Sequence, residues 1–132
     1  MSDGMDTSVA LRLLTGEPAD QAEAARALVA SASDPVAVSD LVVGETYFAL
    51  RHHYGVPHAE AVRALLGLVS DPRVTALGVA RTVLADVAGR GQAKSQPGLM
   101  DRLIHAAYER EGVRLVTFDR GMGRLEGVEV IG

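Results

Sequence analysis

The chain has no cysteine and no tryptophan among its 132 residues, and Lys94 is its only lysine. Without cysteine, disulfide bonds and thiolate metal sites are excluded, and a reducing cytoplasm is the expected compartment. No stretch approaches the roughly 18 consecutive apolar residues that a membrane-spanning helix needs, so no membrane association is expected. Residues 1–6 (MSDGMD) contain no basic region followed by an apolar core, so no secretory signal is predicted.

The composition is that of one folded domain covering residues 1–132. Hydrophobic residues make up 48% of the chain and charged residues 23%, which is ordinary for a globular protein of this length. The net charge of −4 is unfavourable for binding nucleic acid, but two bound divalent cations would offset it. All basic residues except Lys94 are arginines. Their guanidinium groups suit phosphate, although a GC-rich coding sequence explains the same bias equally well.

Helical periodicity alternates with short β-rich runs along the whole chain, which predicts an α/β fold with helices covering a central parallel sheet of about five strands. Helices are predicted over residues 9–14, 18–32, 40–54, 57–69, 79–88 and 99–111, strands over 36–39, 74–77, 114–118 and 128–131, a short helical turn over 121–125 and a polar loop over 89–98. A first strand before Asp6 is expected to be short, because Met5 is its only strand-like apolar residue.

Four acidic residues occupy unusual positions. Asp6 and Asp119 follow predicted strands directly, and Asp101 lies in the first turn of a helix. Each has an ordinary explanation: a helix N-cap for Asp6, a favourable helix dipole for Asp101 and a turn for Asp119. Glu45 lies on a helical face with Leu41 and Phe48.

A carboxylate on an apolar face is costly unless a cation meets it. Glu45 is therefore expected either to pair with an arginine, such as Arg51 or Arg81, or to face a cleft that holds a cation. Because the carboxyl ends of parallel strands share one edge of a sheet, the four acids are expected to meet there. Oxygen ligands without cysteine favour Mg²⁺ or Mn²⁺ over zinc. A metal held this way lowers the pKa of a bound water and neutralises charge on phosphate, as nucleases require.

Four motifs in this order resemble the PIN domain and, more narrowly, the toxin ribonucleases of VapBC toxin–antitoxin pairs. The motifs are residues 6–9 (DTSV), 39–45 (SDLVVGE), 100–107 (MDRLIHAA) and 115–120 (LVTFDR). The resemblance extends from Asp6 to Ile131. It implies a three-layer α/β/α fold and endonucleolytic cleavage of RNA that depends on Mg²⁺ or Mn²⁺.

The resemblance also implies residue roles. Asp6, Asp101 and Asp119 would hold metal directly or through water, and Glu45 would orient water or a second ion. Hydroxyl groups that fix these carboxylates would come from Ser8 and Thr117. The family's members commonly form homodimers and are silenced by an antitoxin protein, which would lie on the apolar helices between Pro18 and Val69.

The basic residues offer four candidates for holding RNA phosphate: Arg12, Lys94, Arg102 and Arg120. Arginines usually cover surface, so these assignments depend on the structure. His105 follows Asp101 by one helical turn, and a surface or packed role is expected for it.

Two other functions remain open from the sequence. An aspartyl-phosphate enzyme also places acids at strand ends, but a dehalogenase-like phosphatase needs a second aspartate where Ser8 stands, and a receiver domain needs a lysine after a late strand. A catalytically silent PIN-like module that binds RNA or protein is the stronger alternative. Four retained acids repel one another without metal, which favours the nuclease.

Overall fold

The structure is a computed structural model that describes residues 2–90 and 97–132. In chain order the elements are α1 (Thr7–Thr15), α2 (Ala19–Ser31), β1 (Val36–Val38), α3 (Asp40–His52), α4 (His58–Ser70), β2 (Val74–Ala76), α5 (Ala80–Arg90), α6 (Leu99–Arg110), β3 (Leu115–Thr117), the 3-10 helix η1 (Arg120–Arg124) and β4 (Val128–Val130). The strands pair in parallel. The α/β class predicted from the sequence is therefore confirmed.

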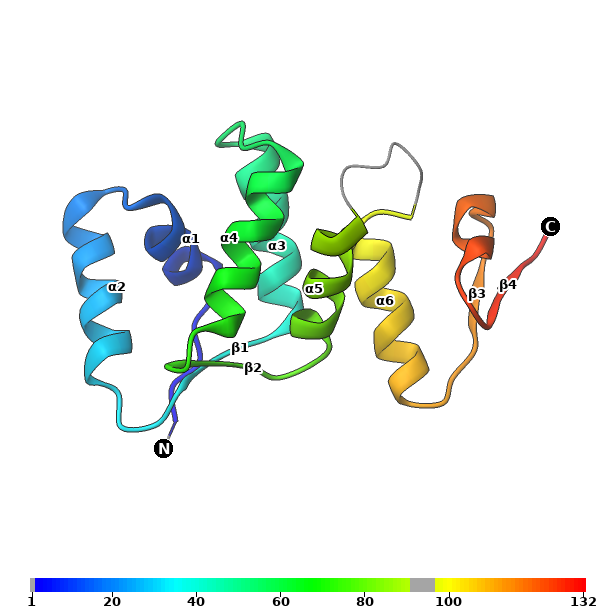
Figure 1. Cartoon of the computed structure of the whole chain (residues 1–132). Coiled ribbons are helices and arrows are strands. Elements are labelled where there is room, and N and C mark those ends of the chain that lie inside the picture. Colours follow the sequence, from blue (N-terminus) through cyan, green and yellow to red (C-terminus); the bar gives the residue numbers. More distant parts are fainter. Residues whose placement is uncertain (1, 91–96) are drawn as a thin grey trace.

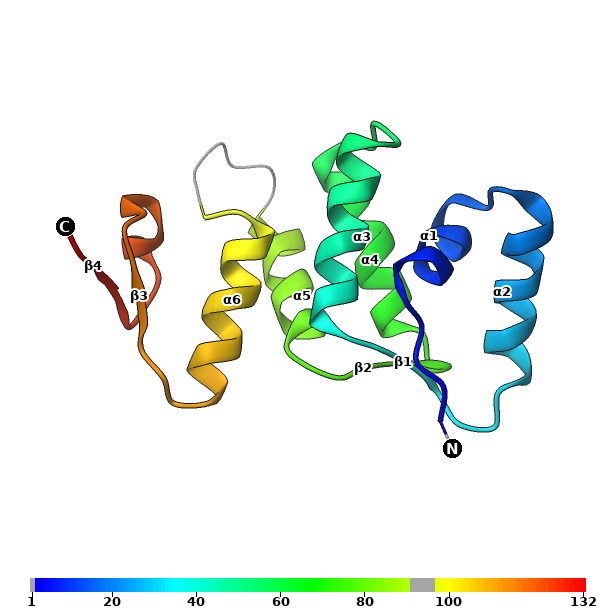
Figure 2. The same ribbon diagram turned by 180° about the vertical axis from the view of Figure 1, so that it is seen from behind.

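The elements follow one another in an extended row (Figure 1). At one end lies α2, followed by α1, the pair α3 and α4, then α5 and α6, and the strands β3 and β4 lie at the other end. The view from behind shows the same order, with β1 and β2 running beneath the central helices (Figure 2). In both views the central helices separate the N-terminal segment from the C-terminal strands.

One apolar core joins the central helices to β1. Its largest fully buried side chains include Leu65 of α4, Leu84 of α5 and Leu99 of α6, and they pack with Val36 and Val38 of β1. Burying such side chains is the main contribution to folding, at roughly 1.5–3 kcal/mol for each of them. None of the helices in the described ranges has the length and apolar character to cross a bilayer.

Within the described residues the strands form two separate parallel pairs, in place of the single central sheet predicted from the sequence. β1 pairs with β2, and β3 pairs with β4. The predicted first strand is reduced to one bridge between Gly4 and Ala37. Ala37 donates to the Asp3 carbonyl and accepts from the Met5 amide, each at 2.8 Å. The sheet is therefore interrupted between residues 3–5 and β3.

The interruption follows from how α6 ends. Gly112 has φ +70°, a left-handed conformation that glycine adopts without strain. The Gly112 amide donates to the Glu109 carbonyl at 3.0 Å, and the Val113 amide donates to the Tyr108 carbonyl at 2.9 Å. This turn directs residues 113–132, here called the C-terminal strand unit, away from β1. The buried side chains of the unit, Leu115 and Met122, are not part of the main core.

Asp40 links the end of β1 to the start of α5. Its carboxylate accepts hydrogen bonds from the Val79 amide at 3.0 and 3.1 Å and from the Ala80 amide at 3.0 Å. The first N–H groups of a helix have no partner within the helix and carry partial positive charge, so a carboxylate there stabilises the helix start. The sequence pattern does not reveal this role, because Val79 and Asp40 are far apart in the chain.

We expect Asp40→Ala to lower the free energy of unfolding by about 1–3 kcal/mol, because half-buried backbone N–H groups lose their acceptor. Urea unfolding followed by circular dichroism measures the change. Asp20→Ala is the matched control: Asp20 is an exposed acid in the first turn of α2, and its loss should change stability by less than about 0.5 kcal/mol. Equal stability of the two variants would contradict the role given to Asp40.

Candidate metal and nuclease site

Asp6 stands between residues 3–5 and α1, and it caps that helix. Its carboxylate Oδ1 accepts from the Val9 amide at 3.2 Å and from the Ser8 hydroxyl at 2.6 Å. These bonds favour the charged carboxylate, and the Ser8 bond contributes most to lowering the pKa of Asp6 below its usual value. Asp6 is therefore the N-cap of α1, as the ordinary explanation from the sequence expected. A cap of this kind leaves Oδ2 for another partner.

Glu45 lies on α3 beside Asp6. The Thr7 hydroxyl donates to Glu45 Oε1 at 2.8 Å, so Glu45 is tied to the residue that follows Asp6 in the chain. The predicted ion pair with Arg51 or Arg81 is not among those of the described residues. Leu41 is 76% exposed, and Glu45 itself is exposed. The apolar face of α3 is therefore open to solvent, and the cost of desolvation expected for Glu45 does not arise.

Asp101 lies where α6 crosses α3. The two helices approach so closely that a side chain at Gly44 would collide with the sulfur of Met100. Glu45 follows Gly44 in the chain, and Asp101 follows Met100. Asp101 is half-buried, and no hydrogen bond or ion pair is recorded for its carboxylate among the described residues. Asp101 therefore lies on a helix that packs against the helix carrying Glu45.

Asp119 is in a different part of the molecule. It follows β3 in the C-terminal strand unit and is exposed, and its carboxylate accepts from the Gly121 amide at 2.8 Å. The Thr117 hydroxyl accepts from the Asp119 amide at 3.0 Å and makes no recorded bond to the carboxylate. The turn explanation considered for Asp119 therefore describes its contacts. In a single copy of the chain Asp119 is carried away from Asp6.

The candidate phosphate-binding residues divide into two groups. Arg12 donates through Nε to Gln21 at 2.7 Å and joins α1 to α2. Arg102 is only 16% exposed at its side chain; it contacts Asp86 at 3.6 Å and donates to the Pro97 carbonyl at 3.2 Å. These two arginines hold helices together. Arg120 is exposed next to Asp119, and Lys94 lies outside the described residues.

The four acids do not fit a divalent cation as a single copy places them. Across residues 2–90 and 97–132, no group of three or more histidine, aspartate or glutamate side chains is arranged to hold a metal ion. The donor chemistry is right, because Mg²⁺ and Mn²⁺ take carboxylate oxygens, but the geometry is incomplete. Asp6 and Glu45 are joined through Thr7, and Asp101 lies at the α3–α6 contact. Asp6, Glu45 and Asp101 do not form such a group, and Asp119 lies farther away in the C-terminal strand unit.

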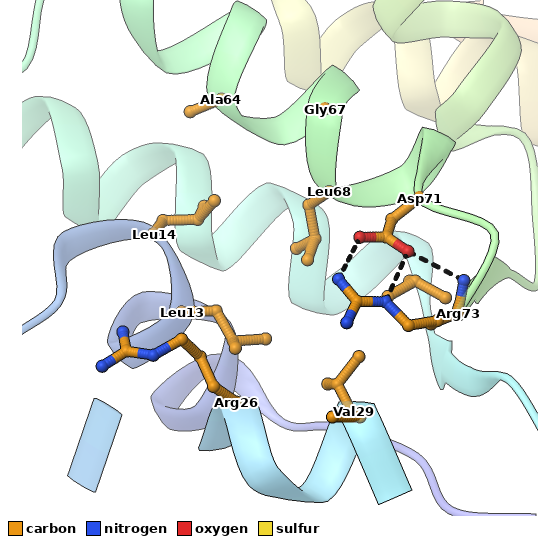
Figure 3. A pocket seen from close by; sticks show the side chains of 11 residues that line it. Leu13, Leu14, Arg26, Val29, Ala64, Gly67, Leu68, Asp71 and Arg73 are labelled. Carbon is orange, nitrogen blue, oxygen red and sulfur yellow. Dashed lines mark hydrogen bonds and ion pairs between the residues drawn. The ribbon is translucent and has the colours of Figure 1, made fainter. Parts of the chain in front are cut away.

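A cavity of about 440 Å³ lies apart from the acids, between α1, α2 and α4 (Figure 3). Apolar side chains such as Leu13, Leu14 and Leu68 form its wall. Arg73 stands at its edge, where its guanidinium binds Asp71 at 2.9 Å and holds the pKa of that carboxyl at about 2. The sequence predicted apolar helices in this region. It did not predict the cavity, because the cavity depends on how α1, α2 and α4 pack together.

His105 contacts the C-terminal strand unit. One of its ring nitrogens, Nε2, lies 2.7 Å from the Glu126 carbonyl, which accepts the hydrogen bond. His105 thus binds the backbone of the C-terminal strand unit, and a surface or packed role was expected for it.

Comparison with known proteins identifies the family. The family model of the PIN domain matches residues 5–128. No curated protein matches. Among solved structures, the chain is similar to VapC20 of Mycobacterium tuberculosis, a toxin that cleaves the sarcin-ricin loop, with 24% identity, 98% of each chain covered and a TM-score of 0.45.

We expect Ser8→Ala to raise the pKa of the Asp6 carboxyl toward its ordinary value, because the strongest hydrogen bond to the charged form is lost. Carboxyl carbon chemical shifts followed by NMR between pH 2 and pH 6 measure this pKa. Ser31→Ala is the control, since the Ser31 hydroxyl donates to the Ala27 carbonyl in α2 and should leave Asp6 unchanged. An unshifted pKa in Ser8→Ala would show that Ser8 does not hold the carboxylate.

Proposed function

The chain belongs to the PIN domain family, and on that premise we propose that it is an endoribonuclease that requires Mg²⁺ or Mn²⁺ and acts as the toxin of a type II toxin–antitoxin pair. The observation that carries this proposal is the contact of Glu45 with Thr7, directly beside Asp6. This contact holds Glu45 at the end of residues 3–5, where Asp6 also lies, although the two exposed acids are 39 residues apart in the chain.

The residue roles follow from chemistry and position. Asp6, Asp101 and Asp119 would supply the oxygen ligands that a hard cation prefers, and Glu45 would orient water. Ser8 and Thr7 keep Asp6 and Glu45 in place by the hydrogen bonds described above. Of the arginines considered for phosphate, Arg120 is the one whose exposed position beside Asp119 supports contact with RNA.

The toxin role requires a surface for an antitoxin. The cavity between α1, α2 and α4 supports this part of the proposal, because its apolar wall can bury side chains of a partner. Arg26 and Arg73 are exposed at the lining and favour a partner segment that also carries acidic groups. None of the four acids lines this cavity. An antitoxin that docks here would need a further segment to reach them.

The second candidate function is a catalytically silent PIN-like module that binds RNA or protein. The incomplete carboxylate group in a single copy is the observation that favours it. The two functions differ in one outcome: the silent module binds RNA or metal without turnover. Cleavage that depends on metal and on the acids excludes it.

We expect Asp101→Asn to abolish cleavage of a mixed cellular RNA pool by the metal-stripped protein after Mg²⁺ or Mn²⁺ is restored. A neutral amide is a poor ligand for a hard cation, so metal binding and the cleavage that depends on it should be lost. The same variant should keep its circular dichroism spectrum and its melting temperature, because like charges at the site are reduced. RNA fragments are separated on a denaturing gel.

Asp20→Asn serves as the control for this experiment, since it removes an equal charge from an exposed helix start outside the site. It should cleave like the original chain. Full activity of Asp101→Asn would remove Asp101 from the site. An original chain that is folded, free of antitoxin and still inactive would favour the silent module.

A further inference from the structure

The C-terminal strand unit is a two-stranded parallel sheet whose apolar side chains are largely exposed. A parallel pair of strands is normally buried on both faces, and two strands alone are marginally stable. Here Phe118 is 78% exposed and Val116 is 46% exposed. Val130 of β4 and Ile131, which follows it, are exposed as well. These side chains need a partner that covers them.

Two open strand edges on the molecule match each other. Asp3 and Met5 bond to Ala37 on β1, so the amide and carbonyl of Gly4 point to the opposite edge, where the described residues supply no backbone partner. On β3 the Thr117 carbonyl accepts from the Ile131 amide, so the backbone groups of Val116 point away from β4 by alternation. Each edge therefore offers one donor and one acceptor to a parallel neighbour.

Joining these edges would bring Asp119 next to Asp6. In a parallel pair, a residue whose backbone bonds to the neighbouring strand stands opposite a residue whose backbone points away. A pairing of Gly4 with Thr117, next to Val116, meets this condition and places Asp6 opposite Asp119. Neighbouring strands lie about 4.8 Å apart, so carboxylates at these positions can reach one cation. The resulting strand order is β2, β1, residues 3–5, β3 and β4.

The same copy cannot make this contact in the arrangement observed. The Gly112 turn and the hydrogen bond between His105 and the Glu126 carbonyl attach the unit to the end of α6. α6 is itself anchored by buried Leu99 and Leu103. Both views show the unit at one end of the molecule, with the central helices between it and the N-terminal segment (Figures 1 and 2).

We propose that two copies of the chain exchange their C-terminal strand units, so that β3 of each copy pairs with residues 3–5 of the other. Each site then contains Asp6, Glu45 and Asp101 of one copy and Asp119 of the other copy. A twofold exchange satisfies both open edges at once and closes the assembly as a dimer. The inference rests on the proposed nuclease function for its activity readout only.

The first experiment combines two inactive variants. Asp6→Asn and Asp119→Asn chains carrying different tags are co-expressed, and the mixed dimer is isolated through both tags. The exchange leaves one of its two sites with no substitution, so the mixed dimer should recover about half of the original activity per dimer. The control is a mixed dimer of Asp6→Asn and Glu45→Gln, whose substitutions lie on the same side of the exchange, and it should remain inactive.

Recovery in the first mixed dimer and none in the control would establish the exchange. No recovery beside an active original chain would overturn it, because each site would then lie within one copy.

The second experiment does not depend on activity. Light scattering should give a dimer of the 13.9 kDa chain, and Phe118→Asp should give a monomer at the same concentration, because the charge is placed in the exchanged contact. Tyr54→Asp, at an exposed aromatic residue beyond the end of α3, is the control and should remain dimeric. A monomeric original chain, or a dimeric Phe118→Asp, would overturn the exchange whether or not the chain cleaves RNA.

Discussion

The pairing of residues 3–5 with β1 is the contact on which the candidate site depends. Through the two hydrogen bonds to Ala37, it fixes where the chain turns into α1 and therefore where Asp6 caps that helix. Thr7 in the first turn of α1 then reaches Glu45 on α3. If this short edge were to slip by one residue, every side chain in it would change face, and Asp6 would lose its position relative to Glu45.

The sequence predicted the local elements well because each has a local physical cause. Asp6 and Ser39 are N-caps with side-chain bonds to the following turn. The helix after Ser39 begins at Asp40 as predicted, and α1 begins at Thr7, two residues before its predicted start. The parallel pairing was predicted from the alternation of helices and strands. The break in the sheet was not, because it depends on the turn at Gly112 and on packing of α6 against its neighbours, which are long-range properties.

The four acids were found by their positions relative to predicted elements, but their grouping was only partly predictable. Glu45 accepts a hydrogen bond from Thr7, the residue that follows Asp6 in the chain. The exposure of Glu45 was not foreseen, since an apolar face on a helix says which side chains can be buried and not whether a neighbour covers them. The role of Asp40 was not predicted, because the amides that its carboxylate accepts from belong to Val79 and Ala80, which are distant in the chain.

Separating Asp119 from the other acids has a physical advantage for a chain without metal. Like charges close together raise one another's pKa and destabilise the fold, and carrying one acid on a separate unit avoids this repulsion. Metal and the exchanged contact would then favour each other, because the cation binds the assembled group better than its parts. The proposed exchange thereby links oligomeric state to metal binding.

The most direct test is a crystal structure of the protein grown with Mn²⁺, with the ion located by its anomalous scattering. The account predicts an ion bound by Asp6 of one copy and by Asp119 of a second copy, with the sheet continuous across the two chains. An ion bound by both residues of a single copy would contradict the exchange. The absence of any ion from the carboxylates of a saturated crystal would contradict the metal site itself.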